Sequence, residues 1–302
     1  MSMKPGIAAV GTFDGLHKGH QAVLDAVAER ASRRDGVGFI ISFDRHPLTL
    51  VNPSRAPKAL LTEEKKIRRL KEKGLTTEIF KFDNELKSLT ASQWLKLLKE
   101  KLGIDEIILG YDNTFGSDGV DLSVEDYKKI ASSLGMEIRV APYVEGASSS
   151  EVRKLISKGE IEKANEILGY PYALEGEVGN GKHIGRTLGF PTANLSPDPS
   201  LVMPGQGVYA AAALLPSGEK VAAMVNIGVN PTVGKIVQPS IEAHLIGWEG
   251  NLYGCKLELI FLKRLRDEMK FASLSELGNQ LEKDREETLK VFSASANNLA
   301  EL

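Results

Sequence analysis

The sequence predicts an α/β protein of two domains: a mostly parallel sheet covered by helices, then a small antiparallel β-barrel with a C-terminal helix. Three observations predict this class. A chain of 302 residues suits two hydrophobic cores better than one. Its first half alternates short apolar runs with amphipathic stretches, and its second half has apolar runs separated by turns with helix only at the end.

The apolar runs of the first half have the length and composition of buried strands. They cover residues 7–10, 38–42, 77–80, 106–109 and 137–140. Helical signals fall between them: Thr62 can cap a helix that Gly74 ends, and Ser123 with Asp126 resembles a capping box before a helix ending near Gly135. Strands that alternate with helices predict a parallel sheet whose ligands bind beyond the carboxyl ends of the strands.

In the second half, strand-like runs are separated by turns rich in Gly, Pro and Asn. They cover residues 172–178, 207–215, 220–227, 240–246 and 256–262, and a helix is expected over 274–291. A sheet without intervening helices must cover its edges, and closure into a barrel does this. We therefore predict domains over 1–168 and 169–302.

Composition narrows the class of function. Lys and Arg number 38 against 40 Asp and Glu, so no basic field favours nucleic acid as a partner. Cys255 is the only cysteine, which excludes an internal disulfide and a cysteine-based zinc site and fits a reducing compartment. No run approaches the ~18 apolar residues of a membrane span, and we expect a cytoplasmic protein with no membrane partner.

The densest motif follows the first strand and reads G-T-F-D-G-L-H-K-G-H over residues 11–20. His17 and His20 are three apart, so they share a face on the first helical turn, and Gly19 leaves the backbone open to a phosphate. Helix starts favour anions, and two imidazoles there can donate hydrogen bonds to a triphosphate. The same histidines could instead cap or pack the helix, while a two-histidine metal site lacks a third ligand nearby.

This motif resembles the H-x-G-H signature of the nucleotidylyltransferase superfamily, whose domain is Rossmann-like. Its longer form resembles the adenylyltransferase half of bifunctional bacterial riboflavin kinase/FAD synthetase. Further matches to that family follow in order over residues 42–47, 109–116 and 148–153.

The resemblance implies that Ser149, Ser150 and Arg153 bind ATP phosphates, although Ser149 or Ser150 could also cap a helix. It places Asp112 and Phe115 on the FMN side of the site. Three positions depart from the family pattern, and one of them, Ser150 in place of Thr, keeps the hydroxyl. Thr114 stands where many relatives carry Arg, and Gly146 where many carry a basic residue, so positive charge that could steady pyrophosphate is lost.

The second half contains G-x-x-x-x-G-K over residues 176–182, but His183 stands where a P-loop needs Ser or Thr and no helix follows. The continuation to P-T-A-N at 191–194 resembles the riboflavin kinase motif. Thr192 and Asn194 are two apart, so both point to one face of an extended segment. The resemblance implies that they hold Mg²⁺ beside ATP phosphates. The flexible and basic residues expected to close over those phosphates are Gly181, Lys182, Gly185 and Arg186.

Phosphoryl transfer needs a group that accepts the proton of the acceptor hydroxyl. The family's catalytic glutamate falls at Glu242, whose apolar neighbours suggest an inward-facing side chain; the alternative is an outward strand carboxylate. Arg266 falls where the family has its flavin-side loop. The basic run over residues 65–69 is expected to be a solvated helix face.

The resemblance spans residues 6–291 and implies two ATP- and Mg²⁺-dependent activities, riboflavin to FMN in the second domain and FMN to FAD with release of pyrophosphate in the first. Two alternatives stay open. One is a riboflavin kinase whose first domain is inactive, and the other is a non-catalytic flavin or nucleotide sensor. Riboflavin, FMN and ATP are the expected small-molecule partners, and the oligomeric state cannot be read from the sequence.

Overall fold

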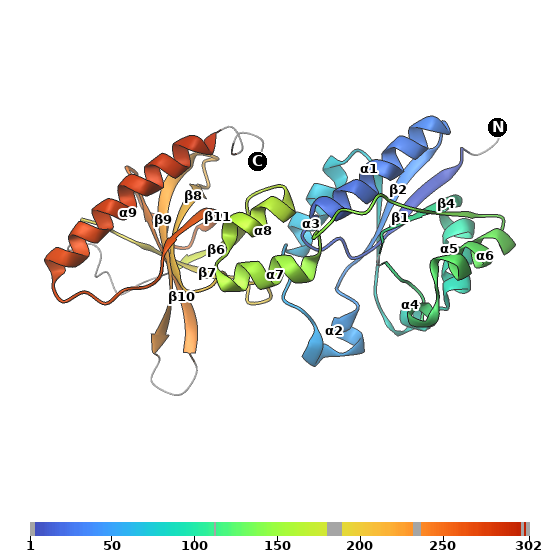
Figure 1. Ribbon diagram of the computed structural model, residues 1–302, viewed down its shortest axis with the longest axis horizontal. Helices are drawn as coiled ribbons and strands as arrows, with labels where there is room; N and C mark the ends of the chain where they lie inside the picture. The colour runs from blue at the N-terminus through green and yellow to red at the C-terminus, as the bar shows by residue number, and fades with distance from the viewer. Residues whose placement is uncertain (1–3, 112, 180–188, 232–236, 297–298, 300–302) are drawn as a thin grey trace. The chain divides into compact units, whose positions relative to one another are not determined.

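The computed structural model describes residues 4–111, 113–179, 189–231, 237–296 and 299 (Figure 1). The chain divides into two compact units, Met1–Ser149 and Ser150–Leu302. Each unit has its own secondary-structure class, as the sequence predicts.

The first unit is built on a five-stranded parallel sheet in the order β3-β2-β1-β4-β5. All five predicted strands are present. The strands are β1 (Gly6–Val10), β2 (Val37–Phe43), β3 (Thr76–Phe80), β4 (Ile104–Leu109) and β5 (Glu137–Val140). The helices are α1 (Lys18–Arg33), α2 (Leu48–Val51), α3 (Glu63–Glu72), α4 (Asn84–Ser88), α5 (Ala91–Leu102) and α6 (Val124–Ser133), with short 3-10 turns at Pro53–Arg55 and Gly119–Asp121.

Helices cover both faces of this sheet, because alternate residues of β1 face opposite sides. Ala8 and Val10 belong to a core with residues of α5 and α6. Ile7 and Ala9 belong to a second core, with residues of α1 and with Leu70 of α3. Two buried faces fix the sheet in a rigid layer, so the loops at its carboxyl edge start from defined positions.

The predicted helix caps are confirmed. The Thr62 side chain accepts a hydrogen bond from the Lys65 amide, and Ser123 with Asp126 forms a reciprocal capping box. Glycines with left-handed φ angles follow both helices, at Gly74 and Gly135.

The prediction of a solvated helix face over residues 65–69 is wrong for its first two residues. Lys65 and Lys66 are only 8% and 7% exposed. The Lys66 ammonium donates to the carbonyl of Phe43, at the end of β2, and pairs with Glu63 at 2.8 Å. Those contacts compensate the loss of water around the charge. The sequence could not reveal them, because Phe43 lies 23 residues away.

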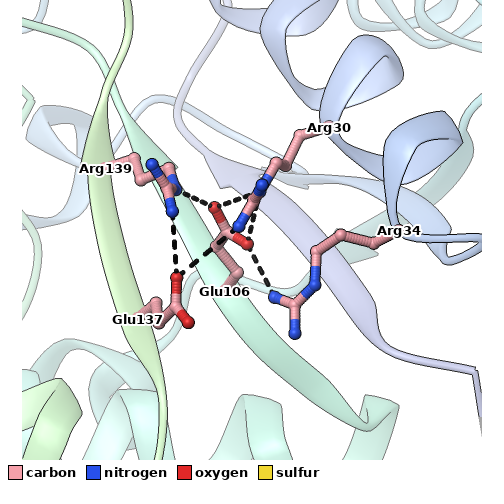
Figure 2. Close-up of polar contacts among 5 residues, drawn as sticks. All are labelled: Arg30, Arg34, Glu106, Glu137 and Arg139. Carbon is pink, nitrogen blue, oxygen red and sulfur yellow. Dashed lines mark hydrogen bonds and ion pairs between the residues drawn. The ribbon is translucent and has the colours of Figure 1, made fainter.

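A buried carboxylate ties the end of α1 to the sheet (Figure 2). Glu106 of β4 is fully buried and accepts hydrogen bonds from Arg30 of α1, from Arg34 at the C-cap of α1 and from Arg139 of β5, at 2.6 to 2.9 Å. Glu137 pairs with Arg139 at 3.3 Å. Burial alone would raise the pKa of Glu106, but the hydrogen bonds and charges of the arginines hold this pKa below its usual value. The network therefore fixes the axis of α1, whose other end carries His20.

The second unit contains a closed six-stranded barrel in the order β10-β7-β6-β11-β8-β9, with antiparallel neighbours. Its strands are β6 (Ala173–Gly179), β7 (Ala193–Pro197), β8 (Gly207–Leu214), β9 (Lys220–Pro231), β10 (Val237–Leu245) and β11 (Lys256–Arg266). Its helices are α7 (Ser149–Lys158), which begins at the last residue of the first unit, α8 (Ile161–Leu168) and α9 (Leu274–Ala294). The predicted barrel and C-terminal helix are present, whereas β7 was expected only as an extended segment.

The inside of the barrel is apolar, and α9 covers part of its outside (Figure 1). Val225, Ile227 and Ile241 are buried at positions paired across β9 and β10. Ala212 and Ile260 pack outward in a small cluster with Val291 and Phe292 of α9. Within the described ranges, no helix has the length and apolar character needed to cross a membrane.

Candidate active sites

The loop between β1 and α1 has unusual backbone geometry. Phe13 and Leu16 have φ angles of 49° and 41°, and Gly15 between them has 79°. Left-handed angles are strained for residues with side chains and are found at functional sites that need a fixed backbone. The Leu60 amide donates to the Asp14 carboxylate at 3.0 Å, and the Gln21 side chain donates to the Leu16 carbonyl at 2.8 Å. These bonds hold the strained loop in place.

The predicted histidine pair forms at the start of α1. His17 is the N-cap residue, and its Nδ1 accepts a hydrogen bond from the His20 amide at 3.3 Å. The two rings stack with centroids 3.7 Å apart, and Phe13 packs its ring against the edge of His20 at 5.4 Å. His17 is 6% exposed and His20 is half-buried. Capping and packing therefore orient both imidazoles at a helix N-terminus, where an anion is favoured.

Glycine is required at position 19 by close packing, as well as by the access of a phosphate to the backbone. A Cβ added there would lie 3.1 Å from Cε1 and Nδ1 of His17 and 3.3 Å from the Cβ of Ala147. Any larger residue would press on the imidazole and move it. The motif alone indicated space for a phosphate but not this contact, because Ala147 is distant along the chain.

The second segment that was predicted to bind phosphate is joined to the β1–α1 loop by a hydrogen bond. The Ser149 hydroxyl donates to the carbonyl of Asp14 at 2.9 Å. Helix α7 begins at Ser149, so both serines lie in its first turn, and N-capping by either one stays a prediction. Ser150 is exposed, and Arg153 is half-buried one turn further along α7.

Gly146, one of the two departures from the family pattern that remove a basic residue, lies in the turn before α7. Its φ angle is 71°, and the Ala147 amide bonds to the Val144 carbonyl at 3.3 Å. Glycine adopts that angle without strain, so a turn requirement accounts for the residue in this chain.

After β4, Phe115 is a core residue. It is 8% exposed, and the centroid of its ring lies 4.7 Å from the ring centroid of Tyr127. The Tyr127 hydroxyl forms hydrogen bonds with the backbone of Phe115. The Asn113 amide donates to the Val10 carbonyl, at the end of β1. Asp112 lies outside the described residues. A direct contact of Asp112 or Phe115 with FMN therefore stays a prediction.

In the second unit, strand register gathers the predicted kinase residues. Glu242 of β10 lies directly opposite Asn194 of β7, and paired residues share a face of the sheet. The Thr192 hydroxyl is 3.5 Å from a Glu242 carboxylate oxygen. A hydroxyl, an amide and a carboxylate thus belong to neighbouring residues just before β7, on β7 and on β10. The predicted phosphate-covering residues Gly181, Lys182, Gly185 and Arg186 lie outside the described part of the chain.

The expected inward direction of Glu242 is wrong. Its neighbours Ile241 and Ala243 are buried in the barrel, and Glu242 is half-buried between them, on the outer face. Side chains alternate along a strand, so a polar residue between two core residues must point outward. The alternative prediction, an outward-facing carboxylate on the strand, is therefore correct about the direction of the side chain. The carboxylate nevertheless lies against Thr192 rather than in open solvent.

Arg266 is the last residue of β11 rather than part of a loop. Its guanidinium forms a two-pronged ion pair with the buried carboxylate of Asp284 in α9, at 2.8 to 3.2 Å. Register still places it with the kinase residues. Directly paired positions run around the outer face from Asn194 through Glu242, Asn226 and Val208 to Arg266, and we call these five residues the outer row.

Two residues that shape the sites were not singled out from the sequence. Asp14 anchors the first loop through its carboxylate and its carbonyl. Its position inside the 11–20 motif could have indicated this role. Asp284 holds Arg266 and is 4% exposed. The sequence did not indicate the role of Asp284, because it is one of many charged residues in the middle of a helix.

A helix start lined with imidazoles and a strand face carrying hydroxyl, amide and carboxylate groups define an enzyme that transfers phosphorus-containing groups. The comparisons agree. The FAD synthetase family matches residues 2–153, and the riboflavin kinase family matches residues 168–292.

Relatives match both halves together. The chain is 33% identical to the bifunctional riboflavin kinase/FMN adenylyltransferase of Bacillus subtilis, over 95% of this chain and 92% of the relative. It is 34% identical to the enzyme of that name from Escherichia coli K12, over 92% and 90%. A crystal structure described as a macrolide-efflux protein from Streptococcus pneumoniae superimposes with a TM-score of 0.85 at 29% identity, over 95% of each chain. The chain belongs to the bifunctional riboflavin kinase/FMN adenylyltransferase family.

Proposed function

We propose that this chain makes FMN and FAD in two successive steps at two separate sites. It phosphorylates riboflavin to FMN and adenylylates FMN to FAD, using one ATP in each step. The observation that carries the proposal is that each unit, matched by its own family, has a cluster of polar side chains among its described residues. These sites are the stacked histidines of α1 and the Thr192–Glu242 pair of the barrel.

In the kinase step, Glu242 accepts the proton of the terminal ribityl hydroxyl of riboflavin. The hydroxyl oxygen attacks the γ-phosphorus of ATP, the bond from that phosphorus to the bridging oxygen breaks, and ADP leaves. The half-buried position of Glu242 beside Thr192 suits this role, because the carboxylate is held at a fixed point yet is reachable from the outer face.

A Mg²⁺ ion is also part of the proposal. Hard divalent cations prefer oxygen ligands, and the Thr192 hydroxyl with the Asn194 amide, close to a carboxylate, supplies a suitable set of oxygens. We assign Thr192 and Asn194 as the residues that would hold the ion. When bound, it would neutralise charge on the ATP phosphates.

In the adenylylation step, a phosphate oxygen of FMN attacks the α-phosphorus of ATP, and pyrophosphate leaves. His17 and His20 donate hydrogen bonds to the phosphates and stabilise the charge that grows on the leaving group. Ser149, Ser150 and Arg153 bind the triphosphate in the proposal. The hydrogen bond from Ser149 to the β1–α1 loop supports this role for Ser149.

Three further expectations accompany this function. We place the domain boundary after residue 168, where the riboflavin kinase match begins, whereas the compact units of the structure divide at Ser149. We expect a cytoplasmic enzyme with one reduced cysteine. The balance of 38 basic and 40 acidic residues favours small-molecule substrates over nucleic acid.

The direct test is a time course in which the purified chain is incubated with riboflavin, ATP and MgCl₂ and the flavins are separated. FMN that appears first and then converts to FAD is the expected result. FMN that accumulates without FAD would leave a kinase with a silent first domain. Absence of turnover would contradict both activities.

A further inference from the structure

Asn226 lies beside the proposed base on the side away from the P-T-A-N segment. It belongs to β9, and register pairs it directly with Glu242 of β10. Glu242 therefore has an amide neighbour on each side, Asn194 on β7 and Asn226 on β9. Side chains at directly paired positions have Cβ atoms about 4.5–5.5 Å apart, within reach of one small ligand.

The Asn226 side chain has a specific polar partner. Its Nδ2 donates to a carboxylate oxygen of Glu268, which follows β11, at 3.4 Å. Glu268 lies close to β9 because Gly228 has no side chain. A Cβ added at Gly228 would lie 2.5 Å from the same Glu268 oxygen. Two residues 42 positions apart are thus brought together at the edge of the kinase site.

The two sides of Glu242 differ in chemistry. The β7 side carries Thr192 and Asn194, which the proposed function gives to the nucleotide and its metal ion. A base that removes a proton from the acceptor must lie between the phosphoryl donor and the acceptor alcohol. The β9 side, with Asn226 and Glu268, is therefore the side left for the acceptor.

We propose that Asn226 binds the hydroxyl chain of the acceptor and that Glu268 positions Asn226 through their hydrogen bond. This inference rests on the proposed kinase function. An amide that gives one N–H to Glu268 still offers its carbonyl oxygen to a ribityl hydroxyl. The exposed Glu268 carboxylate offers a second acceptor to a neighbouring hydroxyl. Polyol recognition of this kind selects flavins that carry the sugar chain.

The test uses the full chain and the kinase reaction. In Asn226→Ala, the KM for riboflavin should rise about threefold to tenfold, as for one lost hydrogen bond, while the KM for ATP stays within twofold. Inhibition by lumiflavin, which has the flavin ring but no hydroxyl chain, should keep its wild-type inhibition constant. A defect that is merely structural would change the constants for ATP and lumiflavin as well.

Glu268→Ala should give a smaller rise in the same KM, and it should add little in the Asn226→Ala background because the two residues act through one bond. Ser196→Ala is the matched control. Ser196 is exposed on β7 two positions beyond Asn194, outside the site, and its loss should change neither KM. The far-ultraviolet circular dichroism spectrum and the midpoint of thermal unfolding report folding of every variant.

Three results would overturn the inference: an unchanged KM for riboflavin in Asn226→Ala, a rise confined to ATP, or an equal rise in the lumiflavin inhibition constant. Failure of the proposed function is distinguishable from these results. In that case the wild-type chain itself would not phosphorylate riboflavin.

Discussion

In the first unit the histidine motif of the candidate site occupies ten consecutive residues, 11–20, where β1 passes into α1, whereas in the barrel the candidate site is spread over β7, β9 and β10. The first is fixed by local backbone geometry: left-handed residues, an N-cap histidine and a stacked ring pair. The second is fixed by strand register, which places Asn194, Glu242 and Asn226 side by side. The barrel site needs the whole sheet to be formed before its residues meet.

Because the two sites are fixed in different ways, each activity can be lost without loss of the other. Changes at a helix start disturb one loop, and changes in a strand row disturb one face of a barrel. Since each unit has its own core, a substitution in one unit should leave the activity of the other unit intact.

The largest effect is expected from Glu242→Gln, which keeps the shape but cannot accept the proton. Loss of a general base costs about 10²–10⁴ in rate, and riboflavin phosphorylation should fall by that range. FAD formation from supplied FMN should remain at the wild-type rate. Separate assays with riboflavin and with FMN measure the two values, and near-normal kinase rates would refute Glu242 as the base.

His20→Ala should give the opposite pattern. Removing one donor to a developing charge costs about 10²–10³, so FAD formation from FMN should nearly vanish while riboflavin is still phosphorylated. The same pair of assays applies. Loss of both activities in a folded variant would contradict the separation of the sites.

Glu106→Gln tests whether the two units also differ in the free energy of unfolding. Its three arginine partners are 27% to 53% exposed, so the loss should be about 2–4 kcal/mol, less than for a wholly buried network. The effect should be confined to the first unit. In a Trp248→Phe background, the fluorescence of buried Trp94 reports urea unfolding of that unit. Glu137→Gln, at a 54% exposed position of the same network, is the control and should cost less than ~1 kcal/mol.

The pH dependence follows from the lowered pKa of Glu106. A depressed native pKa contributes stability that is fully present above the ordinary value of 4.5 and is lost as the pH falls through the native value. The difference between wild type and Glu106→Gln should therefore be large at neutral pH and shrink in acid. A difference that grows in acid would contradict this assignment.

The smallest effect is expected from Gly19→Ala. The new methyl would press on His17 by a few tenths of an ångström, and FAD formation should fall about threefold to tenfold. Gly278→Ala in α9 is the control, because its Cβ meets no atom within 4 Å. A fall with Gly278→Ala as large as with Gly19→Ala would mean that packing against His17 is not the cause.

The histidine motif of the first site was predictable because its residues are contiguous. The motif, the cap at Thr62 and the capping box at Ser123 are local features, and local rules found them. The strands were predictable from apolar periodicity, apart from β7, whose Ser196 and Pro197 have weak strand propensity.

The rest depends on contacts between distant residues. Burial of Lys66 depends on the Phe43 carbonyl, and Arg266 is held by Asp284 on a different element. The outer row exists only once the barrel closes, so Asn226 carried no sign of its place beside Glu242. The outward direction of Glu242 was predictable from strict alternation with Ile241 and Ala243.

The most direct test of two separate sites is complementation between two single variants. His20→Ala alone should convert riboflavin only to FMN, and Glu242→Gln alone should leave riboflavin unchanged. Mixed in one tube with riboflavin, ATP and MgCl₂, they should produce FAD, because FMN released by the first variant is adenylylated by the second. FAD formed from riboflavin by either variant alone, or no FAD from the mixture, would contradict the account.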